Sequence, residues 1–230
     1  MHPTKKDARI AGLFYVLMGL PAPFALIYIP RTLIVRGDAA ATAKNILAHE
    51  MLFRVGIFGE LFSAVAFILL ALALYHLLSG VNKTQASLMV ILVAVSAAIT
   101  FVNVVNNIAA LTLFRGDLLA ALDKPQLEAL GMLFLGLHRQ GLVVNESFWG
   151  LWLLPLGLLV MRSGFLPRIL GVMLVVNGFA YLTISFTGLL LPQYERMVFN
   201  STFPAQLGEL WILLWLLIKG VNVQPLAAAS

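Results

Sequence analysis

Three glutamates interrupt apolar stretches of the sequence. They are Glu60 in GELF, Glu146 in NESF and Glu209 in GELW. A charge at the centre of a membrane helix costs roughly 2.5–3.5 kcal/mol, so such residues face a protein interior and mark ion paths, proton relays or ligand pockets. The alternative for Glu60 and Glu209 is a shallow position, where the carboxylate reaches interfacial water and caps a helix start. Inside a bundle, these carboxyl groups could bind a ligand or exchange a proton.

The stretch HRQGLVVNESFWGLW, residues 138–152, gathers further polar types. At about 100° per residue, His138, Asn145 and two tryptophans share one helical stripe, and Arg139 and Glu146 flank it. His138 and Glu146 are about 12 Å apart along the axis, so they are not a local pair of metal ligands. With no HExxH motif either, we predict no metal site and assign no cofactor.

A second polar stripe lies in the stretch SAAITFVNVVNNIAALT. Ser96, Thr100, Asn103 and Asn107 follow one another at spacings of four, three and four residues, which places them on one helix face. Amides inside a membrane bond across helices, either to lock packing or to line a pocket. The predicted pocket residues are therefore Glu60, Asn103, Asn107, His138, Arg139, Asn145, Glu146 and Glu209.

The elements that must position these residues are membrane helices. The chain of 230 residues is 61% hydrophobic and only 11% charged, against about 25% charged in soluble domains. A crossing needs about 20 apolar residues. We predict an all-α polytopic bundle of six transmembrane helices, near residues 10–30, 54–79, 87–114, 138–161, 167–191 and 204–219.

The first and second long loops are each expected to carry a short amphipathic helix. Asp38 is a suitable N-cap before AAATAKNILAHEMLF, and Asp123, Lys124 and Pro125 stand in the order that starts a helix. Pro21 and Pro23 remove two backbone donors and should kink or break the first span. Residues 192–203 are predicted to be a loop.

We expect one integral membrane domain over residues 1–230, with a weak repeat of helical hairpins suggested by TLIVRGDAAA and TLFRGDLLAA. Six spans put both termini on one side, and basic residues beside the short turns favour the cytoplasm in a cell membrane. The basic residues are too scattered to follow nucleic acid, so the expected partners are the bilayer and a small molecule. With no cysteine, disulfides and thiolate chemistry are excluded.

The sequence resembles a family of uncharacterised bacterial multi-pass membrane proteins, domain-of-unknown-function family 4386. The likeness runs from RIAGLFYVL to IKGVN and is most specific in RSGFLPRILG. It implies a membrane bundle, with an acid at Glu60, the histidine of LH at His138 and the GE at Glu209. Trp152 stands where many members have a histidine, and Ile184 where many have an aspartate. These departures argue against a family-wide metal or proton-relay chemistry here.

Three classes of function remain open. The first is transport of a small solute or protons, or small-ligand binding, in a polar intramembrane pocket. The second is a non-catalytic sensing or assembly protein in which polar residues lock helix packing. The third is an intramembrane acid–base or metal-dependent enzyme, which needs acid and base within roughly 3 Å of one point. The sequence favours a non-enzymatic role and assigns no catalytic residue, substrate or oligomeric state.

Overall fold

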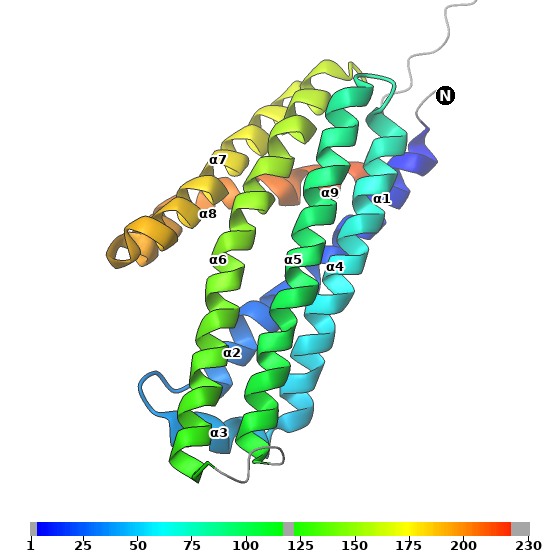
Figure 1. Ribbon diagram of the computed structural model, residues 1–230. Helices are drawn as coiled ribbons and strands as arrows, with labels where there is room; N and C mark the ends of the chain where they lie inside the picture. The colour runs from blue at the N-terminus through cyan, green and yellow to red at the C-terminus, as the bar shows by residue number, and fades with distance from the viewer. Residues whose placement is uncertain (1–3, 117–121, 222–230) are drawn as a thin grey trace, which may run out of the picture. The chain divides into compact units, whose positions relative to one another are not determined.

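The computed structural model describes residues 4–116 and 122–221, and every regular element in those stretches is helical. Most of these elements are α-helices, with one π-helical turn (η1) and one 3-10 turn (η2). In chain order they are α1 Lys5–Gly19, η1 Phe24–Tyr28, α2 Ile29–Leu33, α3 Ala39–Ala48, α4 Glu50–Leu78, α5 Lys83–Arg115, α6 Lys124–Arg162, α7 Arg168–Leu190, η2 Pro192–Tyr194, α8 Glu195–Gln206 and α9 Gly208–Ile218 (Figure 1).

The prediction of an all-α polytopic bundle is confirmed. By length and composition, six helical stretches in the described residues are suited to crossing a membrane. They are Lys5–Leu33, Glu50–Leu78, Lys83–Arg115, Lys124–Arg162, Arg168–Leu190 and Pro192–Ile218. The expected orientation and the cell membrane as location stay predictions.

The predicted break at Pro21 and Pro23 is confirmed. α1 ends at Gly19, and the chain resumes as the π-helical turn η1 before α2. Prolines lack the N–H that an unbroken helix needs, so the ladder restarts with the Ala25 N–H bonding the Pro21 carbonyl at 2.9 Å. Gly59 of α4 lets the broken segment come close, since a Cβ there would lie 3.3 Å from the Pro21 side chain.

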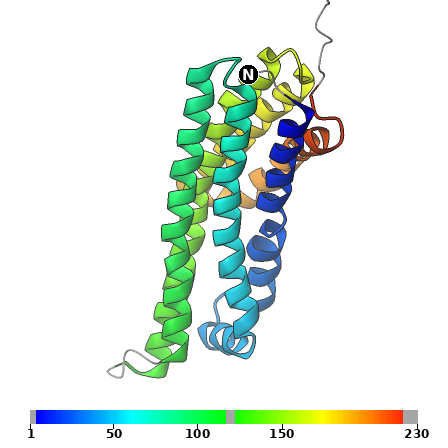
Figure 2. The same cartoon turned by 90° about the vertical axis from the view of Figure 1, so that its right-hand side faces the viewer.

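The short helix predicted in the first long loop is α3. Asp38 caps it as expected, accepting from the Ala41 N–H at 2.8 Å. The preceding Gly37 has a φ of +78°, which permits the tight turn. Thr42 ties the turn down by accepting from the Val35 N–H at 2.9 Å. α3 lies beside α2 (Figure 2).

Two loop predictions are wrong. In the described residues of the second long loop, the predicted short helix is not separate from the fourth span. The start at Asp123 is confirmed by the Gln126 N–H bonding its Oδ1 at 2.9 Å. From Lys124, however, α6 continues to Arg162, because Gly131 and Gly136 each cost only about 1 kcal/mol and do not end a helix. At 39 residues, α6 is about 58 Å long and exceeds the roughly 30 Å hydrocarbon core.

The second wrong prediction concerns residues 192–203, which form η2 and most of α8 instead of a loop. Serine and threonine side chains bond back within α8, as Ser201 does to the Met197 carbonyl at 2.9 Å. The predicted last helix, residues 204–219, is shortened to α9. Its 11 residues rise only about 16 Å, so the sixth span needs α8 as well.

The described residues group into two compact units. Unit 1 comprises the described residues of ranges 1–16, 66–96 and 144–230, and unit 2 those of ranges 17–65 and 97–143. α4, α5 and α6 therefore contribute segments to both. The suggested repeat stays a prediction, since its second copy runs into residues 117–121, which lie outside the described residues.

In unit 1, α7 packs against α8 and α9 (Figure 1). Trp152 of α6 is 1% exposed, and its ring lies 4.9 Å from that of Phe67 and 6.1 Å from that of Tyr15, centroid to centroid. In unit 2, the apolar core draws on η1, α2, α3, α4, α5 and α6. Its buried members are Ile29, Leu33, Ala43, Ile46, Phe53, Ala110, Leu111, Phe114 and Leu135.

Candidate functional site

Four of the predicted pocket residues meet in unit 2, and we call them the polar cluster: Glu60, Asn103, Asn107 and His138. His138 Nε2 lies 3.4 Å from Glu60 Oε2. Asn107 Nδ2 donates to Glu60 Oε1 at 3.4 Å, and Asn103 Nδ2 donates to the His138 carbonyl at 2.8 Å. All four residues are less than 10% exposed. The interior position that the sequence predicts for them is thus found.

The His138 ring fixes where protons can sit. Its Nδ1 lies 3.3 Å from the Asn103 carbonyl oxygen, which only accepts, so Nδ1 carries a hydrogen. Nε2 faces Glu60 Oε2 at 3.4 Å, which is longer than a usual hydrogen bond, and this oxygen has no hydrogen-bond partner within the described residues.

The residues of the polar cluster lie far from the ends of the three helices that carry them. Along the helix axes, Glu60 lies about 15 Å from the start of α4, Asn107 about 12 Å from the end of α5, and His138 about 21 Å from the start of α6. Gly141 makes the approach of α5 and α6 possible, because a Cβ there would overlap the Asn103 amide. The glycine in HRQG thus permits close packing beside the polar residues of that stretch.

The polar cluster borders a cavity of about 690 Å³ in unit 2. Glu60, Asn107 and His138 line it, and so does the predicted residue Arg139. The rest of its wall is mostly apolar, from η1, α2, α4 and α6, including Ala25, Leu26, Ile29, Ile34, Phe53, Ile57, Met132, Leu135 and Leu142. The cavity therefore combines an apolar body with a few convergent polar groups.

Two further arginines line this cavity, although the sequence analysis did not predict them as pocket residues. Arg31 of α2 and Arg36 in the turn before α3 line the cavity and are exposed, so this part of the wall reaches the surface. Both arginines lie in a segment that the sequence predicts to be a loop. Basic residues in such loops were used only to predict the orientation of the protein in the membrane. The break at Pro21 and Pro23 was the available signal, because kinks at such depth often line cavities.

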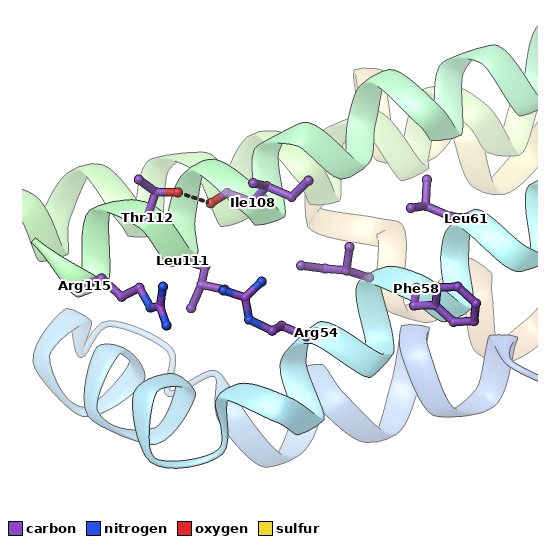
Figure 3. Close-up of a pocket in the computed structure, with 8 residues that line it drawn as sticks. Arg54, Phe58, Leu61, Ile108, Leu111, Thr112 and Arg115 are labelled. Carbon is purple, nitrogen blue, oxygen red and sulfur yellow. Dashed lines mark hydrogen bonds between the residues drawn. The ribbon is translucent and has the colours of Figure 1, made fainter. Parts of the chain in front are cut away.

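A second hollow of unit 2, of about 510 Å³, lies between α4 and α5, and we call it the α4–α5 groove. Figure 3 shows Arg54 of α4 and Arg115 of α5 extending toward each other across it. Both bind one carboxylate, since Arg54 Nε and Arg115 Nη2 lie 2.7 Å and 2.9 Å from Glu50 Oε1. We therefore interpret the arginines of this groove as members of a structural ion pair with Glu50.

The other three predicted residues lie in unit 1, each with its own surroundings. Glu209 accepts from the Tyr15 hydroxyl at 2.8 Å and from Asn177 Nδ2 at 3.0 Å. Although Glu209 stands in the first turn of α9, it thus binds side chains of α1 and α7 and is more than a helix cap. Asn145 accepts from the Ser96 hydroxyl at 2.8 Å. One carboxylate oxygen of Glu146 is buried without a hydrogen-bond partner in the described residues.

Replacing Tyr15 with phenylalanine is expected to lower the free energy of unfolding by about 1 kcal/mol, because Glu209 keeps the Asn177 bond and loses only one donor. Unfolding in mixed micelles measures this loss. Tyr75→Phe is the matched control, since no hydrogen bond of the Tyr75 hydroxyl is found in the described residues. Equal loss in both variants would show that the Tyr15 bond contributes nothing.

Within residues 4–116 and 122–221, no three His, Asp or Glu side chains gather closely enough to hold a metal ion. The pair Glu60 and His138 supplies at most two ligands. We therefore assign no metal or cofactor to the polar cluster.

Comparison with known proteins gives the family. No solved structure matches the chain. An uncharacterised protein of Archaeoglobus fulgidus is 32% identical over 153 residues, which cover 65% of this chain and 74% of that protein. The family model described as Domain of unknown function (DUF4386) matches residues 10–220. Because this model matches most of the chain, the chain belongs to the family described as Domain of unknown function (DUF4386).

Proposed function

We propose that this protein binds a small organic ligand in the cavity of unit 2. The observation that carries this proposal is the placement of Glu60, Asn107 and His138 on the wall of an otherwise apolar cavity of about 690 Å³. Ligand pockets typically measure about 300–1,000 Å³ and combine apolar walls with a few polar groups. Carriers and sensors share this binding step.

The state of the Glu60 carboxylate supports a ligand more than a packing lock. Its Oε2 is buried and, within the described residues, has only the long 3.4 Å contact to His138. If the polar residues served only to hold the helices together, every polar atom would have a hydrogen-bond partner and no cavity would remain. A buried acceptor without a hydrogen-bond partner costs about 1–3 kcal/mol of stability. A ligand hydrogen can fill this acceptor.

An enzyme is less well supported. Glu60 and His138 are close enough to pass a proton, as general acid–base catalysis requires. However, no serine, threonine or tyrosine is found among the described residues that line the cavity. Binding accounts for this pair without a reaction.

Filling the cavity at Gly136 of α6 tests the proposal. Gly136 lines the cavity, and a Cβ there would meet nothing within 4 Å, so a side chain can begin at this position without a clash. We expect Gly136→Ala, Leu and Trp to fold at least as well as the natural protein, since glycine disfavours helix by about 1 kcal/mol. Ligand occupancy should fall as the side chain grows.

Native mass spectrometry of the purified protein measures occupancy as the fraction that carries a non-covalent adduct. Gly80→Trp is the matched control, because Gly80 also has open space and does not line this cavity. An adduct that persists unchanged in Gly136→Trp, or a natural protein that carries none, would contradict the proposal.

A further inference from the structure

We infer that the ligand is a single-chain amphiphile with an anionic carboxylate or phosphate head, held by Arg31 and Arg36. This inference rests on the proposed function and adds the chemical class of the ligand. It follows from the charges on the cavity wall and from the apolar surface that continues from them.

The charge of the wall is positive. Glu60 is the only acid among the described residues that line the cavity, whereas three of these residues are arginines. Arg31 and Arg36 have no carboxylate within 4 Å in the part of the chain that the structure describes. Asp38, the nearest acid in sequence to Arg36, accepts from the Ala41 N–H at the start of α3. An anion would therefore neutralise guanidinium groups that the protein leaves unbalanced.

The guanidinium groups of Arg31 and Arg36 favour an anionic head group on the ligand. Each offers several N–H donors in a planar fork that matches the two oxygens of a carboxylate or phosphate. Arg31 lies in α2 and Arg36 in the turn before α3, and both line the same cavity, so they can approach one head together. A neutral or cationic head would leave both charges unpaired.

The apolar part of the cavity wall favours a hydrocarbon chain as the rest of the ligand. Ile34, Phe53, Ile57, Leu135 and Leu142 line the cavity together with the polar groups. This surface gains free energy by burying hydrocarbon and provides few partners for a sugar or a nucleotide base. One hydrocarbon chain with a compact head fits a cavity of about 690 Å³, which lies within the usual range for small ligands.

Four amphiphiles with the same chain test the inference: oleate, oleyl phosphate, oleyl alcohol and oleylamine. Binding to the purified full chain in a neutral detergent is measured by native mass spectrometry. We expect at least one anion to bind about tenfold more tightly than the alcohol, and the amine to bind most weakly, because charge-assisted hydrogen bonds are worth about tenfold or more. Comparing oleate with oleyl phosphate identifies the head.

Variants then locate the anion. The double change Arg31→Gln and Arg36→Gln should cost the preferred anion about tenfold in affinity and leave the alcohol unchanged. Arg54→Gln is the matched control, since Arg54 lines the α4–α5 groove and not the cavity (Figure 3). Gly136→Trp should abolish binding of the anion.

Three results would overturn the inference. If the alcohol binds as tightly as both anions, or Arg31 and Arg36 prove dispensable, the head is not recognised by its charge. If Arg54→Gln weakens the anion as much as the double variant does, the amphiphile lies in the groove. If none of the four binds while the natural protein carries an adduct sensitive to Gly136→Trp, the proposed function stands and the amphiphile is excluded.

Discussion

Replacing His138 with leucine is expected to lower the free energy of unfolding by about 3 kcal/mol. The variant would leave the Glu60 carboxylate, 8% exposed, with only the long bond from Asn107. It would also remove the ring that bonds the Asn103 carbonyl. A buried acid that loses its partner costs far more than the pair contributes, because its desolvation is no longer offset.

A double-mutant cycle separates the pair from simple loss of packing. Glu60→Met combined with His138→Leu should recover most of the stability, since apolar groups of similar size replace both partners. The control is His76→Leu, because His76 is exposed. The measurement is unfolding in mixed micelles. Additive losses for Glu60 and His138 would contradict the coupling that the 3.4 Å contact implies.

The second large effect is expected at the glycines where α6 and α7 cross. Gly150 faces Gly178, and Gly157 faces Gly171. A Cβ at Gly150 would lie 2.6 Å from the Gly178 carbonyl oxygen, and one at Gly157 would lie 2.7 Å from that of Gly171. Because a backbone carbonyl cannot rotate away as a side chain can, Gly157→Ala should destabilise the protein by about 3 kcal/mol, the upper end for overpacking.

Gly136→Ala is the control in the same helix. Its Cβ meets nothing within 4 Å, so the variant should be neutral or more stable by up to about 1 kcal/mol. Thermal unfolding in detergent measures both variants. If Gly157→Ala is as stable as Gly136→Ala, close packing at the glycine pairs does not hold α6 against α7.

Local features of the fold could be predicted from the sequence. Six long apolar stretches, the break at Pro21 and Pro23, and the cap at Asp38 depend on residues near one another in the chain. α6 and α8 were harder to predict. Residues 124–137 were predicted as a short separate helix and residues 192–203 as a loop, whereas the first stretch runs on into α6 and the second forms η2 and most of α8.

The site could be predicted only as a set of candidates. The cost of a charge in lipid favoured an interior position for Glu60, and helix phase grouped His138 and Asn107 with other polar residues, but neither tells which helices are neighbours. The choice of His138 as the partner of Glu60 depends on contacts between α4 and α6, and Gly141 permits the neighbouring contact with Asn103. The serine of the same stripe, Ser96, bonds Asn145 in unit 1. Residues of one stripe thus have different partners, and the packing of the helices decides which partners these are.

An experimental map of the natural protein in lipid nanodiscs, beside that of Gly136→Trp, tests the central claim most directly. The account predicts non-protein density in the cavity of unit 2, within about 3.5 Å of Glu60, Asn107 or His138. In the variant, the indole should replace that density while the polar cluster keeps its contacts. A cavity closed by side chains, with Glu60 Oε2 bonded to another protein group and no density between, would contradict ligand binding.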